Sequence, residues 1–306
     1  MDANASEPPP RPLWQTVRRR ASAVDVLLLA VVPVALLGVY ALPTATREAF
    51  VFRYASPTAR TAAASPFVHF ERTHLLFNVV GYALIAGTTY VLSVASDRRR
   101  EFLIVFASLL VASPPLLSYL NLAVVRRGVA FGFSGVVMVY YGTLPLALAA
   151  YAQSRLDLGD VTSGAPLLFF SGLFFVTVQT LRAVLANPVT VAVDGVPAPV
   201  TWVLAATLAE LLVLLVLVVA LYALGIADGN PSARTRLRAA IDRPGYAELA
   251  AGALLLFLAV PFATFPSDPV SGTRVFNLYV HVVGYALGFI ASYLYHHLQR
   301  APYPVA

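Results

Sequence analysis

Eight long apolar stretches alternate with polar segments along the chain. Each stretch is long enough to cross the roughly 30 Å hydrocarbon core of a bilayer as a helix. The stretches cover residues 24–42, 74–95, 102–124, 134–152, 165–186, 201–225, 247–266 and 276–297. This pattern predicts an all-α polytopic membrane protein with about eight transmembrane helices in one membrane domain, residues 24–297.

The polar segments between these stretches differ in character. Residues 1–23 are proline-rich and then basic, which predicts a disordered cytoplasmic tail. A signal peptide is the alternative, but the first apolar stretch is longer than a usual signal core. Segment 43–73 mixes aromatic residues with arginines, which favours amphipathic pieces in a long outer loop. Segment 226–246 is arginine-rich and predicts a cytosolic loop, and residues 298–306 form a C-terminal tail.

Composition narrows the class of protein further. Only 12% of the 306 residues are charged, against about 25% in soluble domains. The net charge of +6 comes from arginines spread over the loops, so we attribute it to membrane topology and expect no nucleic-acid partner. The absence of cysteine excludes disulfides, thiol catalysis and cysteine-ligated metals. We predict no cofactor and no metal.

The arginines also predict an orientation. With the amino terminus in the cytosol, more arginines fall on the cytoplasmic side, as expected for a multi-pass protein of the cell membrane. Eight spans return the carboxyl terminus to the same side. The fourth helix then begins at its outer end with Ser134.

Ser134 lies in the sequence Gly132-Phe133-Ser134-Gly135, at the start of the fourth apolar stretch. Most serines in membrane helices bond to their own helix or line a helix contact. A nucleophilic serine would need a histidine as its base. His281 is predicted at the same outer depth, at the start of the eighth helix.

His281 shares a helix face with Gly284 and Gly288. Glycines let two membrane helices approach closely, and Gly135 offers a small residue next to Ser134. The spacing therefore predicts a close crossing of the fourth and eighth helices, with His281 near Ser134. A glycine packing face with an incidental histidine is the alternative.

His74 and Asn78 lie four residues apart, on one face of the second helix and at its outer end. Their ring N–H and amide N–H groups, with the backbone N–H of Ser134, are candidate donors to an oxyanion. An interhelical hydrogen bond that only holds the bundle together is the alternative for Asn78.

Three motifs together resemble the rhomboid family of intramembrane serine proteases. They are His69 with His74 and Asn78 in segment 69–78, the Gly132–Gly135 motif around Ser134, and His281 with Gly284 and Gly288. They occur in the order of that family, which also has a long first outer loop. The resemblance implies a rhomboid-like helical bundle with a six-helix core and two further helices. It implies that Ser134 and His281 form a catalytic dyad, that His74 and Asn78 bind the oxyanion, and that His69 and the glycines support the site. The implied partners are a transmembrane protein substrate and the lipid bilayer; the oligomeric state is left open.

The chain departs from the family pattern in three respects. The first loop lacks the Trp-Arg pair of many members, which leaves the detailed structure of that loop in question. Met138 stands where many bacterial members have a tyrosine that stacks on the catalytic histidine, so His281 needs other contacts to orient it. Three helices instead of one separate the two motifs that carry Ser134 and His281. The extra pair is the fifth and sixth or the sixth and seventh helix.

Other functions have weaker support in the sequence. The spacing of His69 and His74 does not match the HExxH motif of zinc proteases. An aspartyl protease would need paired aspartates in the membrane, whereas Glu210 is the only acid well inside a predicted helix. Because Glu210 is an ionisable residue within a predicted membrane helix, a transporter or channel is an alternative function. A non-proteolytic protein that binds membrane helices is a third possibility, although such relatives typically lose the serine or the histidine. Asp194 and Asp268, in outer loops, are candidates to orient His281.

Overall fold

A computed structural model describes residues 12–124, 128–188, 190–193, 196–228, 243–265, 270–271, 274–275 and 277–300. Among these residues, eight helices are long and apolar enough to span a bilayer. They are α2 (Ala23–Tyr40), α5 (Arg72–Ala95), α6 (Arg99–Leu120), α7 (Ser134–Leu156), α8 (Val161–Ala186), α9 (Thr201–Asp228), α11 (Tyr246–Thr264) and α12 (Leu278–Leu298). The predicted all-α polytopic fold is confirmed, and the chain is a multi-pass membrane protein.

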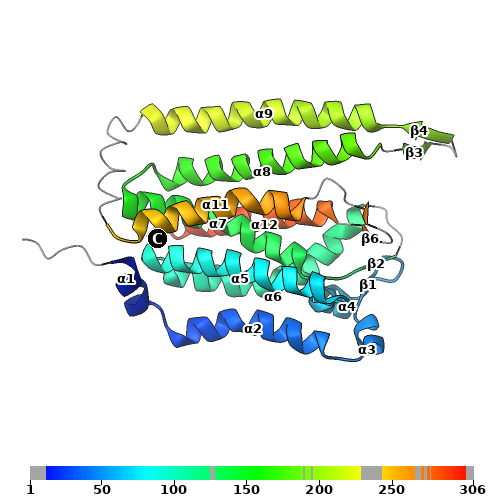
Figure 1. Cartoon of the computed structure of the whole chain (residues 1–306), viewed down its shortest axis with the longest axis horizontal. Coiled ribbons are helices and arrows are strands. Elements are labelled where there is room, and N and C mark those ends of the chain that lie inside the picture. Colours follow the sequence, from blue (N-terminus) through cyan, green and yellow to red (C-terminus); the bar gives the residue numbers. More distant parts are fainter. Residues whose placement is uncertain are drawn as a thin grey trace, which may run out of the picture.

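The helices lie side by side with α7 in the middle of the bundle (Figure 1). Helix α7 packs against α5, α6, α8, α11 and α12, and it is buried almost continuously from Gly135 to Tyr151. Helix α2 covers one edge of the bundle. At the other edge α8 lies between the bundle and α9, which packs chiefly on α8 (Figure 1).

The segment between α2 and α5 folds into short pieces at the end of the bundle where α7 begins. They are α3 (Thr44–Glu48), β1 (Phe52–Arg53), α4 (Ala59–Ala64) and the 3₁₀ helix η1 (Ser65–Phe67). Strand β1 pairs with β2 (Val129–Ala130), in the register Phe52 opposite Ala130. The Ser118 hydroxyl of α6 donates to the Ala62 carbonyl at 2.8 Å. These contacts tie the long loop to the residues that precede Ser134.

Two further hairpins lie at the same end of the bundle, which we call the serine end. Strands β3 (Thr190–Val193) and β4 (Val196–Pro199) connect α8 to α9, and β5 (Val270–Ser271) pairs with β6 (Arg274–Val275) before α12. The first hairpin makes α8 and α9 sequential antiparallel neighbours.

Residues 13–20 correct the prediction of a disordered tail over residues 1–23. They form an amphipathic helix, α1 (Leu13–Arg20), at the end of the bundle opposite Ser134. The Thr16 hydroxyl lies 3.0 Å from the Tyr246 hydroxyl, and Arg20 pairs with Asp97 at 2.8 Å. Contacts with α11 and with the turn after α5 therefore order this segment, which composition alone does not reveal. Residues 1–11 lie outside the described part of the chain.

Buried charges fix α2 against α5 and α6. Asp25, which is 1% exposed, receives two hydrogen bonds of 2.6 Å from the Arg99 guanidinium and one of 2.6 Å from the Tyr90 hydroxyl. Such a bidentate pair has its charges and hydrogen bonds mutually satisfied. Arginines that the sequence assigns to topology thus also hold helix ends together.

The ends of some helices differ from the predicted ends by a few residues. Helix α11 ends at Thr264 rather than at 266, because a residue that precedes a proline, here Pro266, is disfavoured in helical conformation. Helix α9 extends to Asp228, so the predicted loop 226–246 begins later. Residues 229–242 and the tail residues 301–306 lie outside the described part.

Candidate active site

Gly132 sets the geometry of the turn that leads into α7. Its φ of +102° lies in the left-handed region that side chains other than hydrogen rarely adopt. Its N–H donates to the Ser65 carbonyl at 3.1 Å. A Cβ on this residue would come within 2.6 Å of the His74 ring, so the position also needs glycine for space. Four residues after the end of β2, Ser134 is the first residue of α7 and is half-buried.

Helices α7 and α12 cross in close contact along small residues. A Cβ on Gly284 would lie 2.5 Å from the Gly135 carbonyl oxygen, and one on Gly288 would overlap the backbone of Val139. A Cβ on Gly142 would likewise meet the α12 backbone, at 2.7 Å from the backbone nitrogen of Phe289. The close crossing that the glycine spacing predicts is present.

This crossing brings Ser134 and His281 together. The Nε2 atom of His281 lies 2.9 Å from the Ser134 hydroxyl, and the histidine is 4% exposed. The Nδ1 atom lies 3.1 Å from the carbonyl oxygen of Thr264. A carbonyl can only accept, so Nδ1 carries the proton and Nε2 presents its lone pair to the serine hydroxyl. This tautomer is the one in which a histidine can remove a serine proton.

Thr264 and its neighbour Phe265 are site residues that the sequence reasoning missed. The Phe265 ring meets the His281 ring edge-on, with 5.7 Å between the ring centroids. Met138 is fully buried and lies against Gly284: a Cβ added to Gly284 would be 3.2 Å from the Cβ of Met138. The orientation of His281 therefore rests on contacts from the end of α11. Pro266 was the available signal, because it ends α11 and leaves the last carbonyls of the helix without helical partners.

His69 and Asn78 form a second buried pair beside Ser134. The His69 Nδ1 donates to the Phe67 carbonyl at 3.2 Å, so its Nε2 is an acceptor. The Asn78 amide nitrogen lies 2.7 Å from that Nε2, and the Phe133 backbone N–H points to it at 3.4 Å. One Asn78 N–H is thereby used to hold the side chain, and the other has no partner among the described residues.

Burial holds His69 in the neutral form that this arrangement requires. The pKa of His69 is lowered from 6.5 to about 4, first by desolvation and then by the charge of nearby His74. Arg47 supports the residue from outside by donating to the His69 carbonyl. Arg47 also lies over the Tyr40 and Phe70 rings, and it is a third residue that the motifs did not reveal.

His74 lies between His69 and Gly132. Its ring centroid is 4.9 Å from that of His69, and it is half-buried. Its ring nitrogens make no hydrogen bond to any residue that the structure describes. His74 therefore lies against the turn that leads into α7, and its ring nitrogens remain without a partner among the described residues.

Other candidates lie elsewhere or cannot be placed. Asp194 and Asp268 are outside the described residues. His296 lies at the opposite end of α12, where its Nδ1 is 2.9 Å from Glu101. Glu210 projects from α9 at the edge of the bundle, lines neither of the two described pockets and pairs with no described arginine or histidine. Within the described ranges no group of three or more His, Asp or Glu side chains could hold a metal ion.

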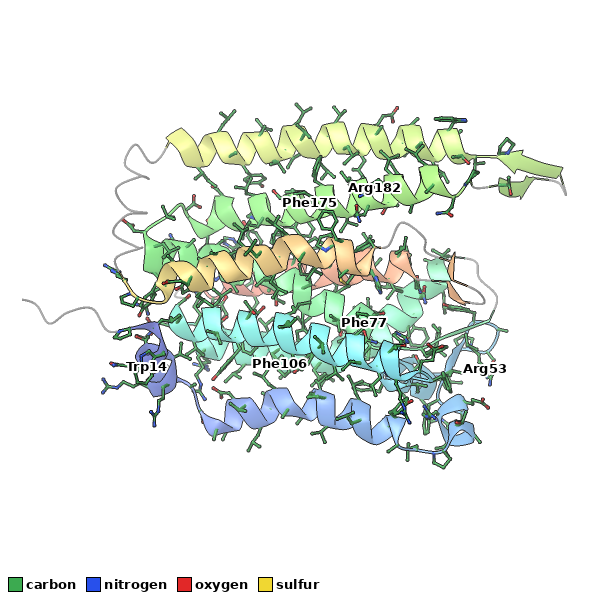
Figure 2. All side chains as sticks on the ribbon, in the orientation of Figure 1. Trp14, Arg53, Phe77, Phe106, Phe175 and Arg182 are labelled. Carbon is green, nitrogen blue, oxygen red and sulfur yellow. The ribbon has the colours of Figure 1, made fainter. Side chains whose placement is uncertain are left out.

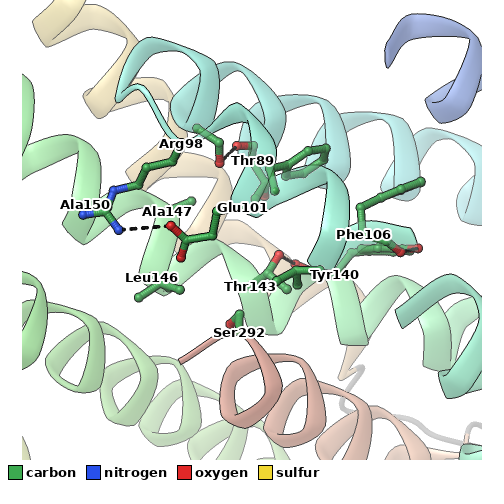
Figure 3. Close-up of a pocket in the computed structure, with 13 residues that line it drawn as sticks. Thr89, Arg98, Glu101, Phe106, Tyr140, Thr143, Leu146, Ala147, Ala150 and Ser292 are labelled. Atoms are coloured by element: carbon green, nitrogen blue, oxygen red, sulfur yellow. Dashed lines mark hydrogen bonds and ion pairs between the residues drawn. The ribbon is translucent and has the colours of Figure 1, made fainter. Parts of the chain in front are cut away.

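A pocket in the opposite half of the bundle does not offer comparable chemistry. Its volume is about 40 Å³, room for a few waters at most. Arg98 and Glu101 form an ion pair at its rim (Figure 3). Its serine and threonine hydroxyls bond to their own helices, as with Thr89 to the Ile85 carbonyl and Thr143 to the Tyr140 carbonyl, both within 2.8 Å. None of these groups forms a hydrogen-bonded pair of a nucleophile and a base.

Comparisons of the chain with protein-family models, with curated proteins and with solved structures find no match. A functional assignment therefore rests on the motifs and on the geometry at the serine end.

Proposed function

We propose that this protein is an intramembrane serine endopeptidase of rhomboid type. The observation that carries the proposal is the hydrogen-bonded series from Ser134 through His281 to the Thr264 carbonyl, with contacts of 2.9 and 3.1 Å. A histidine held in one tautomer by a backbone carbonyl can activate a serine without an aspartate. We propose the orientation in which both termini lie in the cytosol, and in this orientation the site faces the outer side of the cell membrane.

In the proposed reaction, the Ser134 hydroxyl attacks a peptide carbonyl and its proton passes to His281 Nε2. The positive imidazolium is stabilised by the Nδ1–H hydrogen bond to Thr264. The negative oxygen of the tetrahedral intermediate receives hydrogen bonds from His74, from the free N–H of Asn78 and from the backbone N–H of Ser134. His281 then protonates the leaving amine, and a water repeats these steps to release the acyl group.

The proposed substrate is a transmembrane segment of another protein, cut near the outer face. A helix hides its carbonyls in its own hydrogen bonds, so a segment with helix-breaking residues near the cut is the better substrate. The eight-span bundle and its half-buried serine fit a substrate that arrives from within the membrane.

Cleavage of a reporter transmembrane segment by the protein in liposomes tests this proposal. We expect Ser134→Ala and His281→Ala each to lower cleavage at least about 10³-fold, because serine and histidine of such a pair act as a unit. Ser154→Ala and His297→Ala are matched controls on the same two helices, α7 and α12, at the end away from the site.

Cleavage by the Ser134→Ala protein at the wild-type rate would refute the proposal. A folded wild-type protein that binds the reporter segment without cutting it would favour the non-proteolytic helix-binding function.

A further inference from the structure

Glu210 is an ionisable residue on the surface of α9 that faces away from the rest of the bundle. Helix α9 packs chiefly on α8, and its buried residues Ala205 and Leu215 are 8% and 3% exposed. At 100° per residue Glu210 lies on the opposite side of the helix from these two, and it is exposed. Side chains project from this outer surface of α9 into the space beyond the bundle (Figure 2).

The depth of Glu210 makes this position unusual. Trp202, which is 78% exposed, lies near one end of α9, and Tyr222 lies near the other. Tryptophan and tyrosine favour the two membrane interfaces. With a rise of 1.5 Å per residue, Glu210 lies about 12 Å inside Trp202 and about 18 Å from Tyr222. A carboxyl group at this depth needs a polar partner, because lipid tails offer none.

Glu210 lies on one of the exposed stripes of α9 whose spacing matches that of a coiled coil. Alternating steps of four and three residues connect seven exposed positions, which we call the outer seam of α9: Val203, Thr207, Glu210, Leu214, Leu217, Leu221 and Leu224. Such a repeat keeps one stripe of a helix against a parallel partner helix, and a single polar residue within it sets the register. Thr207 and nearby Ala206 are small, which allows close approach beside Glu210.

We infer that the outer seam of α9 joins two copies of this chain into a parallel dimer, in which the two Glu210 carboxyl groups hydrogen-bond to each other. Two copies inserted in the same orientation place their Glu210 residues at the same depth by symmetry. One carboxyl group then donates its proton to the other, so each finds the polar partner that the lipid lacks. This inference does not depend on Ser134 or on proteolysis.

Single-cysteine cross-linking tests the dimer directly, since the natural chain contains no cysteine. Leu214→Cys places a thiol on the seam, one turn from Glu210. Val216→Cys is the matched control: it is 52% exposed, lies at almost the same depth, and points about 120° away from the seam. In liposomes diluted with excess lipid, oxidation should give several times more disulfide dimer for Leu214→Cys than for Val216→Cys.

The role of Glu210 is tested on the Leu214→Cys background. Glu210→Ala removes the hydrogen bond and should weaken dimerisation roughly tenfold, whereas Glu210→Gln, which keeps a donor and an acceptor, should retain it. Subunit counting by stepwise photobleaching of dye-labelled protein in the same liposomes provides a readout that does not depend on thiol reactivity. We expect two bleaching steps.

Three results would overturn the inference. Equal dimer yields at positions 214 and 216 at every dilution would show random collision. Single bleaching steps at all dilutions would show a monomer, with Glu210 covered by lipid or by a different protein. Unchanged dimerisation of the Glu210→Ala protein would show that the carboxyl group does not join the copies.

Discussion

Helices α7 and α9 are both membrane spans, yet they differ in almost every physical respect. The apolar stretch of α7 has a mean hydropathy of 1.5 and is 94% buried, whereas that of α9 has a mean hydropathy of 2.8 and is 11% buried. The less apolar helix therefore occupies the centre of the protein. In a bilayer the lipid is as apolar as leucine, so hydropathy measures contact with lipid rather than membership of the core.

The core helix uses polar groups that have partners. The Tyr140, Tyr141 and Tyr151 hydroxyls of α7 each donate to a backbone carbonyl of a neighbouring segment, at 2.8 to 3.2 Å. Tyr141 donates to the Phe257 carbonyl of α11. This carbonyl is free because its helical partner would be the N–H of residue 261, which is a proline and has none. Satisfied hydroxyls and close glycine contacts let α7 hold Ser134 in a fixed position, and the described side chains of α9 offer no comparable set.

Asn78→Ala should have the largest effect of the substitutions that sharpen this contrast. Loss of one oxyanion donor lowers turnover by about 10²- to 10³-fold in comparable sites. Phe77→Ala is the matched control, because Phe77 is the adjacent residue of α5 and is 79% exposed toward the membrane (Figure 2). Turnover per folded molecule measured with the reporter segment checks the prediction. Unchanged turnover with a large loss of thermal stability would instead assign Asn78 to packing.

Acid should destabilise the serine end through His69. Its folded pKa of about 4 lies below the unfolded value of 6.5, so the unfolded chain binds the proton more readily. Stability is therefore fully present above pH 6.5 and falls as the pH drops toward 4, by about 3 kcal/mol at most. The glutamine of His69→Gln keeps an acceptor for Asn78 but does not titrate. Thermal unfolding of wild type and of this variant across pH therefore isolates the contribution of His69 to the loss of stability. An identical dependence of thermal stability on pH in the two proteins would contradict the statement that folded His69 is neutral.

Glycine substitutions should have opposite effects in the two regions. Gly288→Ala forces a methyl group into the Val139 backbone and should cost about 1–3 kcal/mol. Gly225→Ala in α9 meets no atom within 4 Å and should stabilise that helix by about 0.5–1 kcal/mol. Thermal unfolding in one detergent measures both. Equal effects of the two substitutions would show that the α7–α12 crossing is not tightly packed.

The sequence predicts much of this arrangement because the signals are local. Apolar length predicts all eight spans, and the spacing of Gly284 and Gly288 from His281 predicts the close contact with Ser134. The helix α1 escapes prediction because its order comes from distant partners such as Tyr246 and Asp97. The contact between Thr264 and His281 escapes it because Pro266 indicates free carbonyls at the end of α11 but not which residue they contact. The outward-facing position of Glu210 depends on which side of α9 packs on α8, and the uniform hydropathy of α9 does not reveal that side.

Covalent labelling of the protein by a fluorophosphonate that reacts with activated serines tests the proposed dyad most directly. We expect one label, located on Ser134 by peptide mass spectrometry and lost in the His281→Ala protein, whose serine remains but has no base. Labelling of Ser154 should not occur, although it lies on the same helix. A folded protein that stays unlabelled at Ser134, or whose label persists without His281, would contradict the claim that the α7–α12 crossing creates a nucleophile.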